Sequence, residues 1–162
     1  STITVVMRRE VFETIGFFDE SFFPSDSCLC MPSAEIYHFG ILTSTMHNAW
    51  MRTVCGRLKS DYRYSAGIVY NNFPWAKPNE KQIKVIETKA QAVLDARAEH
   101  KTSTLADLYH SLSMPPNLVK AHKALDKAVD TAYSYKGKKD DAARVSFLFE
   151  CYQKLINNEI KA

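Results

Sequence analysis

Two prolines four positions apart divide this chain into halves with different patterns. Pro74 and Pro78, in the stretch FPWAKP, restrict the backbone and disfavour helix at the residues that precede them. After this stretch the apolar residues recur at the spacing of amphipathic helices, whereas before it short alternating runs are common. The sequence therefore predicts an α+β chain, with a mixed β and helical piece over residues 1–76 and a small α-helical bundle over residues 77–162.

The second part has its own helix signals. The residues at capping or first-turn positions are Asn79 with Gln82, Thr104 with Asp107, Pro115, and Asp140. The apolar stripes are Ile83, Ile86, Ala90 and Val93; Leu118, Ala121, Leu125, Ala128 and Ala132; and Val145, Leu148, Tyr152 and Leu155. Because these signals are independent of the first part, we expect residues 79–162 to fold without it.

The first part mixes short β-like runs with one longer helical pattern. The runs typical of strands are residues 3–7, 11–18 and 28–31, and short β-like pieces return over residues 62–75. Apolar residues recur at helical spacing from residue 36 to about residue 55, with Ser33 as the expected N-cap and Gly56 as the expected stop. A break in this helix is expected at Gly40 or at Thr43-Ser44.

Signatures of common enzyme classes are missing from the sequence. It contains no G-x-G-x-x-G, G-x-x-x-x-G-K-[ST], H-E-x-x-H or G-x-S-x-G motif, and its five glycines provide little material for a cofactor loop. Asn72-Phe73-Pro74-Trp75 has a weak similarity to the N-P-P-[YFW] tetrad of DNA methyltransferases, but a packed turn also explains it. We therefore expect no catalytic residue and no cofactor in this chain.

The cysteines and the apolar runs indicate the redox compartment of the protein and whether it associates with a membrane. Four scattered cysteines give no disulfide framework and indicate a reduced, cytoplasmic setting. Cys28 and Cys30 are half of a zinc site if His38 or His47 joins them, but no second closely spaced pair exists and buried thiols are expected instead. No apolar run is long enough to span a bilayer, so no membrane association is expected.

The stretch with the most informative chemistry is GRLKSDYRYS, residues 56–65. Lys59 and Asp61 are two positions apart, and on an extended backbone such side chains leave the same face. An ammonium only donates hydrogen bonds and suits guanine O6 and N7, whereas a carboxylate only accepts and suits the cytosine amino group. Together they are suited to both halves of one G·C pair. A local ion pair is the alternative, and both interpretations stay open on physical grounds.

Four neighbours of this pair are expected to contact the rest of a duplex. Arg57 and Arg63 are expected to hold phosphates on either side of the base pair. Tyr62 and Tyr64 are expected to point into the core or onto sugars. The basic residues here face a single acid, whereas the net charge of +3 for the whole chain is too small to diagnose a partner.

The helical pattern before this stretch adds a second set of candidates. Met46 and Trp50 are expected in the core. The candidate DNA contacts on the other flank are Ser44, His47, Asn48 and Arg52. Asn48 and Arg52 are an i, i+4 pair of the residue types that bind adenine, guanine or phosphate.

Long stretches of the sequence resemble one family. Residues 39–75, FGILTSTMHNAWMRTVCGRLKSDYRYSAGIVYNNFPW, resemble the end of the target-recognition domain in large MmeI-like (type IIL) restriction–modification proteins and their DNA adenine methyltransferase relatives. The stretches TLADLYHSLSMPPNLVKAHKALDKAVDTAY and AARVSFLFECYQKL are similar to the helical domain that closes those proteins. One departure is Ala76-Lys77-Pro78, where the family usually has proline directly after the tryptophan.

The resemblance implies a division of labour. In such proteins an upstream domain binds S-adenosylmethionine and methylates adenine N6, and family members place base-reading residues at the positions of Lys59 and Asp61. We therefore expect this chain to be a monomeric fragment that contacts double-stranded DNA for a methyltransferase domain upstream in the same polypeptide. The alternative is a helical docking module that supports the catalytic domain without reading bases.

Overall fold

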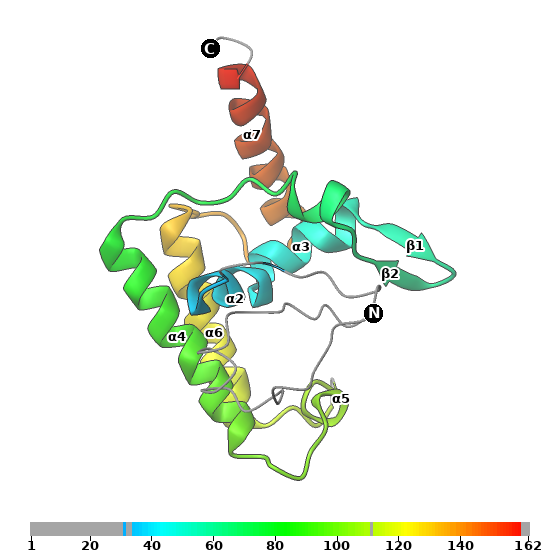
Figure 1. Cartoon of the computed structure of the whole chain (residues 1–162), viewed down its shortest axis with the longest axis vertical. Helices are drawn as coiled ribbons and strands as arrows, with labels where there is room; N and C mark the ends of the chain where they lie inside the picture. The colour runs from blue at the N-terminus through cyan, green and yellow to red at the C-terminus, as the bar shows by residue number, and fades with distance from the viewer. Residues whose placement is uncertain (1–30, 32–33, 111, 160–162) are drawn as a thin grey trace.

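The structure is a computed structural model that describes residue 31, residues 34–110 and residues 112–159. The runs expected as strands over residues 3–7, 11–18 and 28–30, and the expected N-cap Ser33, lie outside the described residues. The α+β prediction is confirmed, because a predominantly helical body carries one small antiparallel ribbon (Figure 1). The elements are α2 (Ile36–Thr43), α3 (Thr45–Val54), β1 (Gly56–Leu58), β2 (Asp61–Arg63), η1 (Ala66–Tyr70), α4 (Glu80–Ala98), α5 (Leu105–Leu108), α6 (Pro116–Ala132) and α7 (Asp141–Glu159).

The expected break in the first helical pattern occurs at Ser44. Its backbone is extended, and its hydroxyl accepts a hydrogen bond from the His47 amide and so caps α3. The first amide of α3, at Thr45, donates to Asp126 of α6 at 2.8 Å. This carboxylate lies at the positive end of the helix dipole and fixes the start of α3 against α6.

Two local predictions in the first part are wrong. Gly56 does not stop α3, because the helix ends at Val54 with Cys55 in an extended conformation and Gly56 is already the first residue of β1. Residues 66–70 are not a strand but one π-helical turn, capped by Ser65. The Asn72 amide donates to the carbonyl oxygens of Gly67 and Ile68, which stabilises the turn.

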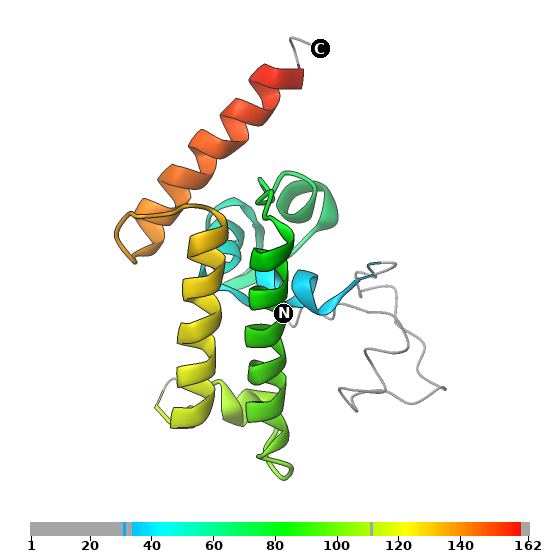
Figure 2. The same cartoon turned by 90° about the vertical axis from the view of Figure 1, so that its left-hand side faces the viewer.

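The helical part begins as its sequence predicts. The capping box of Asn79 with Gln82 is present at the start of α4, and Thr104 with Asp107 caps α5. Asp140 accepts from the Ala143 amide at 2.8 Å and caps α7, while Pro116 occupies the first turn of α6 one residue after the predicted Pro115. Helices α4 and α6 lie side by side in both views (Figures 1 and 2).

Helix α7 has a different neighbour. It packs mainly against α3 of the first part, and its C-terminal half extends away from the body (Figures 1 and 2). Buried residues of both parts form one cluster, which includes Trp50 and Phe73 from the first part and Ile86 and Leu148 from the second. This packing argues against the expectation that residues 79–162 fold alone, because α7 would lose its main packing surface.

Side chains from the second part also hold the proline-rich stretch. Tyr133 of α6 donates to the Pro74 carbonyl oxygen at 3.0 Å, and Tyr152 of α7 donates to Asn72 at 3.4 Å. Phe73 and Pro74 are buried. Asn72 to Trp75 is therefore a packed turn. Among the described residues, no helix is long and apolar enough to cross a membrane.

Candidate nucleic-acid interface

The basic stretch forms a short β-hairpin that projects from the end of α3 (Figure 1). Gly56 pairs with Arg63, and Leu58 pairs with Asp61, so Lys59 and Ser60 form a two-residue turn. Lys59 has a φ of 57°, a left-handed conformation that is uncommon for a residue other than glycine. The premise that Lys59 and Asp61 share a face of an extended strand is therefore wrong, because Lys59 lies in the turn and Asp61 begins the return strand.

The register divides the remaining side chains between the two faces of the ribbon. Cross-strand neighbours share a face, which places Leu58 with Asp61. Arg63 is two positions along the same strand from Asp61 and joins this face. Arg57 and Tyr62 form the other face, where the Arg57 guanidinium carbon lies 3.7 Å from the centre of the Tyr62 ring. The two arginines therefore lie on opposite faces.

The hairpin exposes its charges. All of its residues from Gly56 to Arg63 are exposed except the half-buried Tyr62. Within the described part of the chain, Lys59 and Asp61 make no salt bridge with each other or with another residue. The local ion pair that was the alternative for these residues is thus not formed, and a donor and an acceptor are both presented to solvent at the end of the ribbon.

Tyr64 anchors the base of the hairpin. It follows β2 directly, and its hydroxyl lies 3.0 Å from Nε2 of the fully buried His47. The His47 ring also packs edge-on against Phe73, with 4.5 Å between ring centroids. Burial lowers the pKa of His47 to about 3 and raises the pKa of the Tyr64 phenol, so both groups are neutral at pH 7. No local pattern marks this pair, since 17 residues separate its members.

The four helix residues predicted to contact DNA are used within the protein. Ser44 and His47 are fully buried, so placing them on an exposed flank was wrong. The break at Ser44 rotates α3 so that His47 faces the interior with Met46 and Trp50. The Asn48 amide donates to two carbonyl oxygens at the end of α2, at 2.8 and 3.2 Å. Arg52 donates twice to Asp141 of α7, at 2.8 and 3.1 Å.

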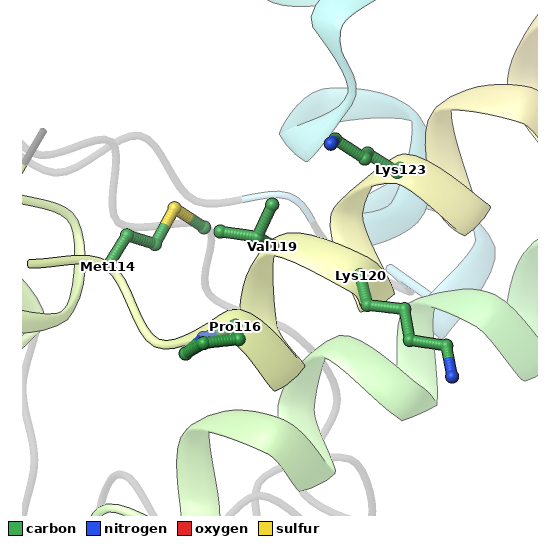
Figure 3. A pocket seen from close by; sticks show the side chains of 5 residues that line it. All are labelled: Met114, Pro116, Val119, Lys120 and Lys123. Atoms are coloured by element: carbon green, nitrogen blue, oxygen red, sulfur yellow. The ribbon is translucent and has the colours of Figure 1, made fainter.

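An open pocket lies on the other side of the helical part, at the start of α6. It is lined by Met114, Pro116, Val119, Lys120 and Lys123 (Figure 3). Its lining combines three apolar residues with two lysines. No described group of His, Cys, Asp and Glu side chains is arranged to hold a metal ion, and Cys28 and Cys30 lie outside the described residues.

The glycines of the described residues are dispersed over the fold. Gly40 is packed inside α2, Gly56 starts a strand, Gly67 belongs to η1 and Gly137 lies in the loop before α7. A loop of several glycines that lets a cofactor approach the backbone is not formed by any of these four.

Comparison with known proteins assigns both parts of the chain. Residues 3–77 match the family description "MmeI, target recognition domain", and residues 77–160 match "MmeI, C-terminal domain". The chain belongs to the MmeI family. Its first part is thus a target-recognition domain, and the hairpin lies within it. The second part, from α4 to α7, is the MmeI C-terminal domain.

Two relatives place this MmeI-family chain within longer proteins. It is 44% identical over 122 residues to "DNA methyltransferase A" of Bacillus subtilis (strain 168), which covers 75% of this chain and 14% of the relative. It is also similar to a solved structure of the type IIL restriction-modification enzyme MmeI in complex with DNA. That match has a TM-score of 0.75 and 52% identity, and covers 79% of this chain and 18% of the other. The chain therefore spans less than a fifth of either relative.

Proposed function

We propose that the β1–β2 hairpin enters the major groove of duplex DNA and reads one G·C base pair through Lys59 and Asp61. The observation that carries this proposal is the exposed ribbon with a donor and an acceptor at its end. The major groove of B-DNA is about 12 Å wide and admits a two-stranded ribbon, so the tip of the hairpin can reach base edges there. The DNA complex of the similar type IIL enzyme supports the choice of partner.

Each charged residue of the hairpin has one role in this proposal. Lys59 donates to guanine O6 or N7, and Asp61 accepts from the cytosine amino group. Arg57 and Arg63 are on opposite faces of the ribbon, which suits contacts with the phosphates of the two strands that border the groove. Tyr64 and His47 do not contact DNA but hold the base of the hairpin against the core.

The chain supplies recognition and another part of the polypeptide supplies catalysis. We infer an upstream methyltransferase domain that binds S-adenosylmethionine and modifies adenine, because the curated relative is a DNA methyltransferase and this chain covers only 14% of it. A cytoplasmic location and a monomeric state belong to the same proposal, since the partner is intracellular DNA and the reading hairpin needs no second copy.

Exchanging the two charges tests the reading of the base pair. The 162-residue chain is used to select duplexes from a randomised pool, and the double variant Lys59→Glu with Asp61→Arg is used in the same way. The double variant should prefer the opposite orientation of one base pair, by about ten- to hundredfold, because each base contact contributes roughly 1–3 kcal/mol of discrimination. If the selected motif is unchanged at every position, Lys59 and Asp61 do not read a base.

Arg57→Ala is the matched control for this experiment. A phosphate contact carries no sequence information, so this variant should bind all duplexes less tightly and select the same motif. If Arg57→Ala changes the selected motif, Arg57 itself reads a base and the assignment of base reading to Lys59 and Asp61 is wrong.

The alternative is a docking module for the upstream domain. Exposed apolar side chains around α5 favour it, since Leu105 and Tyr109 of this region are exposed and Leu112 is 90% exposed. Salt separates the two functions. Binding to DNA weakens steeply between about 50 and 200 mM salt, whereas apolar docking does not.

A further inference from the structure

The loop between α6 and α7 carries a concentrated positive charge. Residues 133–140, YSYKGKKD, include Lys136, Lys138 and Lys139, and all three lysines are exposed. Figure 2 shows this loop at the edge of the molecule, where α6 ends and α7 begins. In the described part of the chain these lysines make no salt bridge.

The neighbouring carboxylates are already engaged inside the protein. Asp130 of α6 pairs with the buried Arg144 of α7 through two hydrogen bonds. Asp140 caps α7, and Asp141 is held by Arg52. Each of these acids therefore has a partner other than the three lysines, whose ammonium groups stay available for an external anion.

Internal contacts hold the backbone of this loop in one conformation. The Tyr135 hydroxyl donates to the Lys138 carbonyl oxygen, and the Tyr135 ring packs on Phe147 with 5.1 Å between centroids. Ser134 has a φ of 54°, so the turn is maintained with a non-glycine residue in a left-handed conformation. A Cβ added at Gly137 would lie 2.6 Å from the Tyr135 hydroxyl oxygen, so a larger residue there would displace the Tyr135 side chain. The lysines are thus presented by an ordered backbone.

An ion pair connects this loop to the base of the hairpin. Asp141 is two residues after Lys139, and its partner Arg52 is four residues before Gly56. Each residue step spans at most about 3.8 Å, so the path from Gly56 through the ion pair to Lys139 is shorter than roughly 35 Å. Gly56 and Lys139 are therefore no further apart than about one turn of duplex DNA.

We propose that Lys136, Lys138 and Lys139 are a second DNA-contact surface, in the C-terminal domain, that binds phosphates of the duplex read by the hairpin. This inference rests on the proposed function of the hairpin. Ammonium groups suit phosphate oxygens and carry no sequence information, so the loop adds affinity and fixes the orientation of the duplex. The two domains of the chain then hold one DNA molecule between them, and the Arg52–Asp141 pair sets the spacing of the two contacts.

The salt dependence of binding measures this surface. The affinity of the full chain for a labelled duplex is determined at several salt concentrations for the wild type and for the triple variant Lys136→Gln, Lys138→Gln and Lys139→Gln. Each phosphate contact contributes about 0.9 to the slope of log K against log salt, so the triple variant should lose roughly two to three from the slope. Its affinity should fall equally for selected and unselected duplexes.

A second triple variant provides the charge-matched control. Lys81, Lys84 and Lys101 are exposed, and α4, which carries the first two, lies on the opposite side of the molecule from the hairpin (Figure 1). Changing these three to glutamine should alter the slope by less than about one. Equal slopes for the two triple variants would overturn the proposal, because the loop would then act only through net charge. If the wild type itself shows no salt-dependent binding, it is the proposed function of the hairpin that fails.

Tyr135→Phe separates the shape of the loop from its charge. Without the hydroxyl, the Lys138 carbonyl loses its partner and the loop must be ordered on binding. We expect weaker affinity with an unchanged salt slope, and a folded protein with the wild-type circular dichroism spectrum. Unchanged affinity would contradict the claim that the loop is preorganised.

Discussion

At the scale of single residues, His47 shows how one buried side chain supports an exposed site. Its ring is fully buried, contacts Phe73 and meets the Tyr64 hydroxyl, which lies one residue after the hairpin. Its other ring nitrogen, Nδ1, has no hydrogen-bond partner in the described part of the chain. Protonation would bury a charge and add an Nδ1–H without an acceptor, so the folded state favours the neutral imidazole that contacts Tyr64 at the base of the hairpin.

Lowering the pH should reduce the free energy of unfolding through protonation of His47. The pKa of His47 is about 3 in the folded chain and about 6.5 in the unfolded chain, so the unfolded state takes up the proton first. The contribution of neutral His47 to the free energy of unfolding is fully present above pH 6.5 and is lost as the pH is lowered toward 3. Between pH 6.5 and 5 the loss should be about 2 kcal/mol. Urea unfolding at a series of pH values measures it.

His47→Gln is the control for the acid effect. Glutamine keeps a hydrogen-bonding group near Tyr64 but does not titrate, so the stability of this variant should change less over the same pH range. His122 contributes in the same direction, because burial and the Arg97 charge lower its pKa to about 4, and it is present in both proteins. An equally steep acid loss in the variant would show that His47 is not responsible.

The sequence could identify the chemistry of single residues better than their exposure. Lys59, Asp61, Arg57 and Arg63 were expected at the surface and are exposed. His47 was expected to contact DNA but is buried, since polar side chains at i, i+3 spacing carry no information on which face a broken helix turns inward.

At the scale of elements, the hairpin combines a strained turn with a reading role. Lys59 at a φ of 57° is less stable than glycine at the same position by roughly 1 kcal/mol. We expect Lys59→Gly to leave the stability of the chain unchanged or to raise it by about 0.5–1 kcal/mol, while base discrimination at one position is lost. Thermal unfolding and duplex selection on the same preparation measure the two effects.

The opposite pattern would contradict this assignment. If Lys59→Gly lowers the stability and the selected motif is retained, then the lysine side chain serves the fold and not the reading of DNA. A loss of both properties would mean that the turn needs the lysine in order to form, which a φ of 57° argues against.

Element types were predictable at the two capping boxes of the second part. The capping boxes at Asn79 and Thr104 begin helices as expected. The segment around Val69 was assigned to a strand because Ile68 and Tyr70 alternate with it, but the decisive contact is the Asn72 amide on the Gly67 and Ile68 carbonyls. Alternation over so few residues cannot distinguish a strand from a single wide turn.

At the scale of the whole molecule, the two domains share one core. Gly40 of α2 marks a close approach, because a Cβ there would lie 2.8 Å from Ile86 Cγ2 and 3.2 Å from Ala90 Cβ. The proline-rich stretch correctly indicated a change of pattern, but a change of pattern along the chain carries no information about packing across it. The Trp50 and Leu148 side chains, far apart in sequence, belong to the same cluster.

Gly40→Ala should destabilise the entire chain. Overpacking costs about 1–3 kcal/mol, which exceeds the gain of up to about 1 kcal/mol from replacing glycine inside a helix. Urea unfolding should show one transition, shifted to lower denaturant, because both domains lose the same contact. Gly67→Ala is the matched control, since nothing lies within 4 Å of an added Cβ there. Two separate transitions would contradict a shared core.

The left-handed backbone at Lys59 also has a consequence for how such proteins can change over time. A position with a φ of 57° tolerates glycine, asparagine and aspartate readily and excludes β-branched residues, whereas Asp61, on an exposed strand, accepts almost any side chain. Position 59 therefore tolerates fewer residue types than position 61. When a new recognition specificity evolves, many different substitutions should be accepted at position 61, whereas only a few residue types should be accepted at position 59.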